Sequence, residues 1–334
     1  MSQLVRGWKL NEYPQGLPTE ATASLVEQAL PPLQADQVLI ENRWLSVDPY
    51  MRGRMIPVKS YVPPFELDQL MEGGAVGEVI ASNHANFPVG TQVMHMQGWR
   101  DYALSDGSDL TPLPAVGAPL QSYLGVLGLT GLTAWAGLNK VGQLQAGDTL
   151  FVSGAAGAVG SVVCQLAKLK GARVIGSVGS DDKGRFLTEQ LGVDAVINYK
   201  TCDNLSQALA ALAPEGLSFY FDNVGGEHLE AAIGNMQDNG QLVICGMIDL
   251  YNSDGSIGGP RNMTEIIRRR LTIKGFIATD HMADFGEFAA EVGGAMAQGQ
   301  LHAQETVYQG LDSTFEAFLG LFSGANTGKM LVKL

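Results

Sequence analysis

The sequence predicts an α/β protein in which a doubly wound parallel sheet is joined to a second, mostly β domain. Two observations carry this prediction. Up to about residue 125, short apolar segments alternate with Gly, Pro and Asn, as strands and turns do. From about residue 130, strand-like and helix-like segments alternate, which is typical of βαβ units around a parallel sheet. A chain of 334 residues also exceeds the usual size of one core, so two domains are expected.

The first half should contain strands within DQVLIENRWLSVD, GGAVGEVIASN and GTQVMHMQGWRDYALS. In the second half, six strands are expected at residues 148–154, 172–178, 194–199, 218–224, 240–246 and 271–277. Helical patterns fall between them at residues 158–171, 183–192, 205–214, 227–236 and 264–270. The last 25 residues contain one more helical pattern and a closing strand.

Composition and charge indicate which binding partners and which cellular compartment to expect. The formal net charge of -13 disfavours nucleic acid, because it would repel phosphate backbones. The N-terminal residues lack the apolar core of a signal peptide and no run of eighteen apolar residues occurs, so we expect neither export nor a membrane span and place the protein in the cytoplasm. Three widely spaced cysteines fit reduced thiols in that compartment.

The stretch VSGAAGAVGS, residues 152–161, places Gly154, Gly157 and Gly160 between a strand pattern and a helix pattern. A helix that begins directly after a parallel strand offers free N–H groups to a pyrophosphate. The three glycines would permit, in turn, a tight turn, a close approach of backbone to phosphate, and close packing of helix on strand. A purely structural turn is the alternative, and the complete βαβ context disfavours it.

The end of the next strand indicates which dinucleotide is bound. NAD sites place Asp or Glu there for the ribose 2′-hydroxyl, whereas a 2′-phosphate requires small residues and a cation. Here Gly179 and Ser180 come first, Asp181 and Asp182 follow slightly late, and Lys183 comes next. This order favours NADP, although Lys183 could equally be a solvated helix residue.

Several longer motifs are specific when taken together: RWLSVDPYMRGRM, GLTGLTAWAGL, VSGAAGAVGSVVCQLAKLKGARVIG, GSDDK, INYK, FDNVGGE, ICGMI, GFI and GANTGKMLVK. Through them the chain resembles the zinc-independent medium-chain dehydrogenase/reductases, in particular the prostaglandin reductase, leukotriene 12-hydroxydehydrogenase and curcumin reductase branch. The resemblance implies a GroES-like domain over residues 1–125 and 303–334 and an NADP-binding Rossmann domain over residues 126–302. It also implies NADPH-dependent reduction of the carbon–carbon double bond of α,β-unsaturated ketones or aldehydes.

Carried over by position, the resemblance assigns cofactor contacts in three groups. Pyrophosphate contacts are Gly157, Ala158 and Val159. Contacts at the adenosine 2′-phosphate are Gly179, Ser180, Lys183 and Tyr199. Contacts to the nicotinamide half are Asn223, Cys245, Tyr251, Phe276, Ile277 and Asn326.

Some of these residues have structural alternatives. Tyr199 could cap the sheet edge, Cys245 could be a small buried hydrophobe, and Asn223 and Asn326 could simply shape turns.

Catalysis without metal is expected. The segment MEGGAVGE lacks the histidine that zinc-dependent members of the superfamily use, and the first 150 residues contain no cysteine. An enolate oxygen must then be stabilised by a hydroxyl, for which Tyr251 is the first candidate and Tyr61 the second. The glycine-rich loop 253–260 is a candidate cover over substrate, or a plain connection.

Two other functions stay open at this point. A quinone reductase of the same superfamily shares the domain plan, and a dinucleotide-binding protein without catalysis belongs to another class. The resemblance further suggests a homodimer, with residues 271–277 as a candidate for pairing between subunits.

Overall fold

A computed structural model describes residues 3–114, 117–253 and 258–334. The chain divides into two compact units. The first comprises Met1–Leu124, Thr306–Asn326 and Met330–Leu334, and the second comprises Gly125–Glu305 and Thr327–Lys329.

The first unit is mostly β. Strands β1 (Leu4–Leu10) and β2 (Ala23–Ala29) form an antiparallel pair. A seven-stranded sheet has the order β14-β15-β3-β4-β5-β7, with β6 paired to β3. Its strands are β3 (Val38–Ser46), β4 (Ala75–Ser82), β5 (Gln92–His95), β6 (Tyr102–Ser105), β7 (Thr111–Pro112), β14 (Glu305–Gln309) and β15 (Lys329–Lys333). Short helical segments are α1 (Tyr50–Arg54), η1 (Leu120–Leu124) and η6 (Leu311–Ser313).

The C-terminal segment completes the first unit, because it supplies both a strand and part of the core. Strand β15 pairs antiparallel with β3, with Leu331 opposite Ser46. Helix α9 (Thr314–Ser323) brings Phe315 to within 5.4 Å of Trp8, ring centre to ring centre, in a stacked arrangement. The strand expected at the chain end is therefore present, and it closes onto a sheet built from the first hundred residues.

The second unit contains a six-stranded sheet in the order β10-β9-β8-β11-β12-β13, and all its neighbouring strands run parallel. These are β8 (Thr149–Val152), β9 (Arg173–Val178), β10 (Ala195–Asn198), β11 (Leu217–Asp222), β12 (Met236–Ile244) and β13 (Thr272–Gly275). All six strands predicted from the sequence occur. The order reverses between β8 and β11, which is where doubly wound sheets bind ligands.

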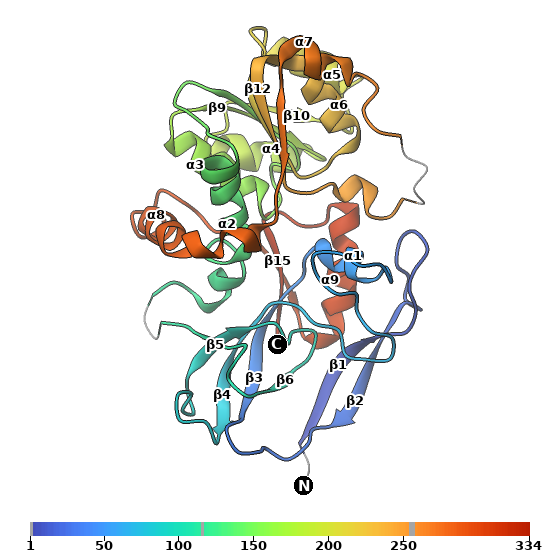
Figure 1. Cartoon of the computed structure of the whole chain (residues 1–334), viewed down its shortest axis with the longest axis vertical. Helices are drawn as coiled ribbons and strands as arrows, with labels where there is room; N and C mark the ends of the chain where they lie inside the picture. The colour runs from blue at the N-terminus through green and yellow to red at the C-terminus, as the bar shows by residue number, and fades with distance from the viewer. Residues whose placement is uncertain (1–2, 115–116, 254–257) are drawn as a thin grey trace. The chain divides into compact units, whose positions relative to one another are not determined.

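Helices cover both faces of this sheet (Figure 1). Buried side chains of α2 (Leu129–Ala136), α3 (Gly160–Leu169) and α8 (Phe285–Ala297) belong to one core cluster, and those of α5 (Leu205–Leu212) and α6 (Gly226–Asn235) to another. On β8, Leu150 and Val152 face the first cluster whereas Phe151 faces the second, as the alternation along a strand requires. The predicted α/β class, with a Rossmann sheet and a mostly β domain, is confirmed.

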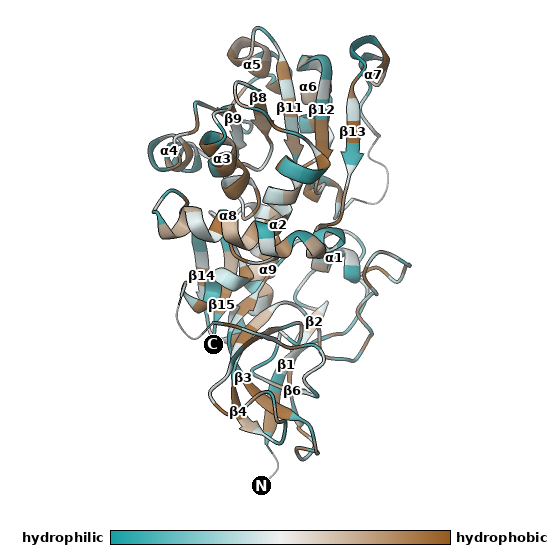
Figure 2. Cartoon of the chain, turned by 60° about the vertical axis from the view of Figure 1, so that its left-hand side comes forward, coloured by the Kyte–Doolittle hydropathy of each residue, from teal (hydrophilic) through white to brown (hydrophobic). Residues whose placement is uncertain are grey.

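Shorter segments complete the second unit. They are η2 (Gly137–Val141), α4 (Asp181–Arg185), η3 (Phe186–Gln190), η4 (Ile248–Leu250), α7 (Thr264–Arg269) and η5 (Ala278–Asp284). Strand β12 carries a hydrophilic stretch after its first residue, Met236, and ends in hydrophobic residues, as the colours of Figure 2 indicate. Its buried second half, with Leu242 and Val243, packs into the core, so the end that carries Ile244 and leads on to Cys245 is anchored.

Candidate dinucleotide site

The cofactor residues predicted in the second unit gather at one edge of its sheet. Each of them follows the carboxyl end of a strand within seven residues along the chain. Gly157 to Val159 follow β8, Gly179 to Lys183 follow β9, and Tyr199 follows β10. Asn223 follows β11, Cys245 and Tyr251 follow β12, and Phe276 and Ile277 follow β13. The carboxyl ends of parallel strands share one edge, so these residues line the edge where doubly wound folds bind nucleotides.

The glycine-rich loop between β8 and α3 has the backbone geometry that glycine permits. Gly154 has φ of +57°, a left-handed conformation. A β-carbon at Gly160 would lie 2.3 Å from the carbonyl oxygen of Gly154, so a side chain there would force the helix away from the turn. Helix α3 begins at Gly160 with Val159 as its N-cap and no side-chain capping bond. The N–H groups of Ser161, Val162 and Val163 already donate to the carbonyls of Gly157 and Val159, so the N–H groups that can meet an anion are those just before them, from Ala158 to Gly160.

Gly157 has a structural partner that the spacing of the loop did not reveal. It forms a parallel bridge with Gly328, whose N–H donates to the carbonyl of Ala156 at 2.7 Å. Gly328 has φ of +70°, and a β-carbon there would lie 1.9 Å from the carbonyl oxygen of Gln304. The glycine of GANTGK is thus required by a close backbone contact that supports the glycine-rich loop.

Ser153 and Asn223 tie the glycine-rich loop to the turn after β11. The side-chain Nδ2 of Asn223 donates to the Ser153 carbonyl at 2.7 Å, and its backbone N–H donates to Ser153 Oγ at 2.9 Å. Asn223 therefore shapes a turn, which was one of its two expected roles. The contact to the nicotinamide half stays a prediction.

A buried carboxylate organises the same turn. Asp222 is fully buried, and its Oδ1 accepts hydrogen bonds from Ser153 Oγ (2.9 Å), Tyr220 Oη (2.7 Å), Val224 N (2.9 Å) and Gly225 N (2.8 Å). Within the described part of the chain, Oδ2 has no hydrogen-bond partner. Burial raises the pKa of Asp222, and the four donors oppose that rise.

Gly179, Ser180 and Lys183 form a tight turn where β9 ends. Ser180 caps α4 by accepting a bond from the N–H of Lys183 at 3.4 Å. The Lys183 side chain is half-buried, and burial followed by the positive charge of Lys200 lowers its pKa. A bound anion would relieve the repulsion between these two cations. The turn therefore fits a phosphate group better than a ribose hydroxyl.

Tyr199 and Lys200 lie over the same turn. A β-carbon at Gly179 would lie 3.0 Å from Tyr199 Oη and 3.2 Å from Lys200 Cε, so a side chain at position 179 would press on both. Burial, and next the carboxylate of Asp249, raises the pKa of Tyr199. Tyr199 remains protonated near neutral pH and can donate a hydrogen bond to a phosphate oxygen.

On the other side of the switch point, Tyr251 packs over the end of β12. A β-carbon at Gly246 would lie 3.3 Å from Tyr251 Oη. The Cys245 thiol packs against the core cluster that includes Phe221, and burial raises its pKa to about 12. Phe276 meets Phe221 edge-to-face at 6.5 Å between ring centres. These residues are held by packing on strands β11 to β13.

The remaining predicted residues have no described contact with this cluster, or lie partly outside the described residues. Ile277 is half-buried and precedes η5. Tyr61 and Asn326 belong to the first unit; Tyr61 is 62% exposed and Asn326 is half-buried. Of the loop 253–260, residues 254–257 lie outside the described residues, so its suggested closure stays a prediction.

Nowhere in the described residues do three or more His, Cys, Asp or Glu side chains group closely enough to hold a metal ion. Among the described helices, none has the length and apolar character to cross a membrane.

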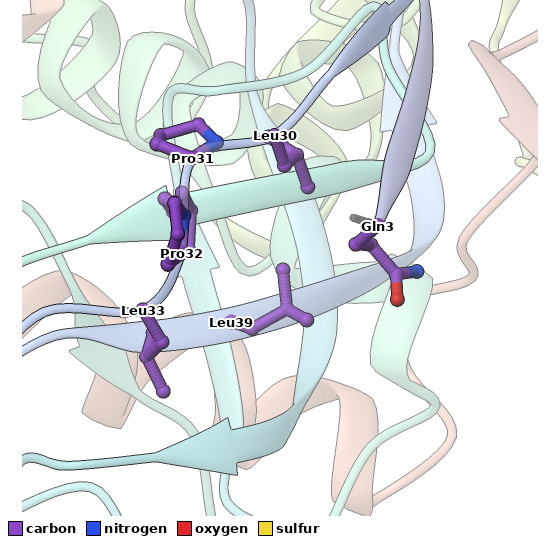
Figure 3. A pocket seen from close by; sticks show the side chains of 7 residues that line it. Gln3, Leu30, Pro31, Pro32, Leu33 and Leu39 are labelled. Carbon is purple, nitrogen blue, oxygen red and sulfur yellow. The ribbon is translucent and has the colours of Figure 1, made fainter. Parts of the chain in front are cut away.

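A pocket of about 330 Å³ in the first unit has none of the predicted residues in its lining (Figure 3). It is lined by Gln3, Leu30, Pro31, Pro32, Leu33, Leu39 and Leu104. None of these seven described side chains titrates, so the pocket offers no group for acid–base chemistry.

The hydrogen-bond donors and cations described above suit a pyridine dinucleotide. The left-handed turn at Gly154 and the start of α3, which lacks a side-chain cap, suit a pyrophosphate. Lys200 beside Tyr199 suits a phosphate. Together with the parallel sheet, these features define an oxidoreductase of the dinucleotide-binding class.

Comparisons with known proteins give the family. The description "N-terminal domain of oxidoreductase" matches residues 6–113, and "Zinc-binding dehydrogenase" matches residues 158–293. The NADPH-dependent curcumin reductase of Escherichia coli (strain K12) is 36% identical over 334 residues, covering 98% of this chain and 96% of that protein. Prostaglandin reductase 1 of Mus musculus is 40% identical over 332 residues, covering 98% of both chains.

A solved structure agrees with these relatives. The crystal structure of CurA from Vibrio vulnificus in complex with NADPH is 40% identical, has a TM-score of 0.93 and covers 98% of both chains. The chain belongs to the zinc-independent medium-chain dehydrogenase/reductase family of NADP-dependent oxidoreductases.

Four residues that support this site were not predicted from the sequence: Ser153, Ser177, His228 and Lys200. Ser153 directly precedes the first glycine of the loop, and Lys200 directly follows Tyr199, so adjacency was an available signal for both. Ser177 and His228 lie 51 residues apart, and nothing in the sequence pairs them.

Proposed function

We propose that the protein reduces the carbon–carbon double bond of α,β-unsaturated ketones or aldehydes with NADPH. The observation that carries the proposal is the cluster of Gly179, Lys183, Tyr199 and Lys200, which suits a 2′-phosphate, at the edge of a sheet whose opposite half carries Tyr251. The name of the E. coli relative, a curcumin reductase, supports the class of substrate, because curcumin contains enone groups, and the mouse relative is likewise named a reductase.

The chain's own residues perform three tasks in this reaction. The glycine-rich loop and α3 bind the pyrophosphate, and the Gly179 turn binds the 2′-phosphate. NADPH, when bound, supplies the hydride that reaches the β-carbon of the substrate. The negative charge that then develops on the substrate carbonyl oxygen needs a hydrogen-bond donor, and we assign this to the Tyr251 hydroxyl, with Tyr61 as second candidate. A proton from solvent completes the product at the α-carbon.

Tyr251 suits this role because it carries a hydroxyl donor whose position is fixed by packing. Its hydroxyl packs over Gly246, directly after the buried end of β12, so its position is set by the sheet rather than by a free loop. A preorganised donor stabilises developing charge without having to reorganise during the reaction.

The test mixes purified protein with NADPH or NADH and follows loss of the reduced nicotinamide absorbance after addition of an aliphatic enone or, separately, a quinone. We expect fast loss with NADPH and the enone, and slow loss with NADH. Turnover with the quinone alone would overturn the proposed substrate class and favour the quinone reductase alternative. Absence of turnover with both acceptors would reduce the proposal to NADPH binding.

A further inference from the structure

His228 is a buried histidine that the proposed reaction does not use. It lies on α6 with 5% of its surface exposed, and its Nε2 is 2.7 Å from Oγ of Ser177, which is fully buried on β9. On its other side, the imidazole ring meets the Tyr199 ring edge-to-face, with 5.0 Å between ring centres and 77° between planes. His228 thus connects three elements: α6, β9 and the segment after β10.

The two contacts converge on the turn at Gly179. Ser177 lies two residues before Gly179 on the same strand, and Tyr199 Oη lies 3.0 Å from where a β-carbon of Gly179 would be. The imidazole therefore anchors the tyrosine ring to the strand whose end forms the turn. The Tyr199 ring is 40% exposed, so its contact with His228 is on the packed side that holds its hydroxyl over that turn.

The charge of His228 is compatible with this role. Burial lowers its pKa to about 4, so the ring is neutral at physiological pH and bonds to Ser177 as a neutral imidazole. Two charged groups act near this histidine: the carboxylate of Asp249 raises the pKa of Tyr199, and the ammonium group of Lys200 lowers the pKa of Lys183. The two lysines would attract the phosphate, whereas the buried, neutral imidazole would hold the Tyr199 ring in position.

We propose that His228 is a positioning residue for cofactor selectivity: by holding the Tyr199 ring against Gly179, it favours dinucleotides that carry a 2′-phosphate. This inference rests on the proposed use of NADPH and deepens it, because it names a residue outside the cofactor contacts that would set the preference for NADPH over NADH.

The test measures binding by calorimetry with two probes, 2′,5′-ADP and 5′-AMP, which differ only in the 2′-phosphate. We expect His228→Ala to weaken binding of 2′,5′-ADP about 3- to 10-fold, the size an edge-to-face aromatic pair supports, and to leave 5′-AMP unchanged. In a Tyr199→Ala background the same substitution should have no further effect on 2′,5′-ADP, because the ring it positions is gone. Gln207→Ala, at an exposed position of α5 in the same unit, is the control and should change neither affinity.

Variants with an apolar partner at position 177 separate positioning from packing. Ser177→Ala with His228→Phe keeps an aromatic ring and removes both polar groups, so it should retain selectivity. Ser177→Ala with His228→Leu fills a similar space without a ring, so it should lose selectivity. This pair also keeps the test valid if His228→Ala fails to fold.

Three results would overturn the role of His228. These are an equal loss of affinity for both probes, a loss that persists in the Tyr199→Ala background, and identical selectivity of the Phe and Leu variants. Equal binding of both probes to the unaltered protein would instead overturn 2′-phosphate recognition itself, and the role of His228 with it. Enone reduction is measured separately and stands or falls on its own assay.

Discussion

Asn223 donates two hydrogen bonds to Ser153, one from its side chain and one from its backbone. The two residues follow neighbouring strands, β11 and β8, and Ser153 also donates to the buried carboxylate of Asp222. The glycine-rich loop is therefore held from its first residue by the next turn of the sheet. The glycine-rich loop and the FDNVGG turn therefore support each other at the point where the strand order reverses.

Substitution of Asn223 tests this connection. Asn223→Ala removes one of the two bonds and leaves the Ser153 carbonyl without its donor, which should lower the free energy of unfolding by about 1–2 kcal/mol. Because the loop serves any pyrophosphate, KM should rise for NADPH and NADH alike. Urea unfolding and steady-state kinetics with both cofactors measure these effects.

Asn235→Ala is the matched control for Asn223. Asn235 also bonds through its Nδ2 to backbone, at the carbonyls of Ala231 and Ser206, but at the far end of α6. It should cost comparable stability and leave KM for both cofactors unchanged. A higher KM for only one cofactor in Asn223→Ala would contradict the view that this residue supports the loop as a whole.

The buried carboxylate of Asp222 predicts a pH-dependent stability. Burial raises its pKa above the ordinary value of 3.8, so the native state holds this proton more tightly than the unfolded chain. The stability from this group is complete below pH 3.8 and is lost as pH rises to the native pKa, by at most about 1.4 kcal/mol per pH unit. Asp222→Asn removes this titration and keeps an acceptor for the four donors.

Urea unfolding across the acid to neutral range measures the effect. The stability of the unaltered protein relative to Asp222→Asn should fall as pH rises. A relative stability that grows with pH would mean that the four hydrogen bonds outweigh burial and hold the pKa below 3.8. Asp222→Ala leaves four buried donors unsatisfied and should cost about 3 kcal/mol or more at any pH.

The sheet of the second unit could be predicted because its strands are apolar, short and separated by amphipathic helices. Helix α8 was not predicted, since Gly286, Gly293 and Gly294 weaken its helical pattern. Among the described residues outside the helix, none lies within 4 Å of where a β-carbon at these glycines would be. The helix forms because Phe288 and Val292 are fully buried in a core cluster shared with α2, where Phe288 meets Trp135 with 6.2 Å between ring centres. Tertiary packing thus overrides the local preference.

For the site, sequence spacing identified which residues follow strand ends, because that depends on local pattern alone. It could not identify what those residues touch. The contacts of Asn223 with Ser153 and of His228 with Ser177 join positions 70 and 51 residues apart. They depend on strand order and on the rotation of α6, neither of which a single sequence displays.

Lys200 should contribute to phosphate binding alongside Lys183. Its side chain lies over Gly179, and its charge acts on Lys183. Lys200→Gln should raise KM for NADPH about 3- to 10-fold and leave KM for NADH unchanged, because only NADPH carries the 2′-phosphate. Steady-state kinetics with both cofactors provide the comparison.

Arg173→Gln is the control for Lys200. Arg173 is exposed at the start of β9, five residues from the end that leads to Gly179, and its removal changes net charge equally. It should leave both KM values unchanged. If both substitutions weaken NADPH binding to the same extent, overall charge rather than a local contact is responsible.

Tyr251 and Tyr61 are distinguished by removal of a single oxygen from each. Tyr251→Phe should lower kcat with an enone about 10- to 1,000-fold, since it removes a donor to the developing oxyanion, and leave NADPH affinity within about two-fold. Tyr61→Phe should have a smaller effect. Single-turnover kinetics separate chemistry from product release. Full turnover in Tyr251→Phe would remove this residue from the mechanism and leave Tyr61 as the candidate.

The exposed edge of the parallel sheet predicts a homodimer. Among the described residues, β13 pairs only with β12, all four of its residues are exposed, and Ile267 on the preceding α7 is 80% exposed. An open strand edge beside an exposed aliphatic side chain favours pairing with a second copy. Sedimentation velocity should give a mass twice 35.5 kDa.

A charge on this edge should oppose pairing. Ile273→Lys together with Ile267→Lys should shift the protein toward monomer, because each subunit would bring the same charges to a symmetric contact. Val89→Lys alters a residue that is 63% exposed in the first unit and should leave the mass unchanged. A monomeric unaltered protein, or a dimer that persists in the double variant, would exclude β13 as the contact.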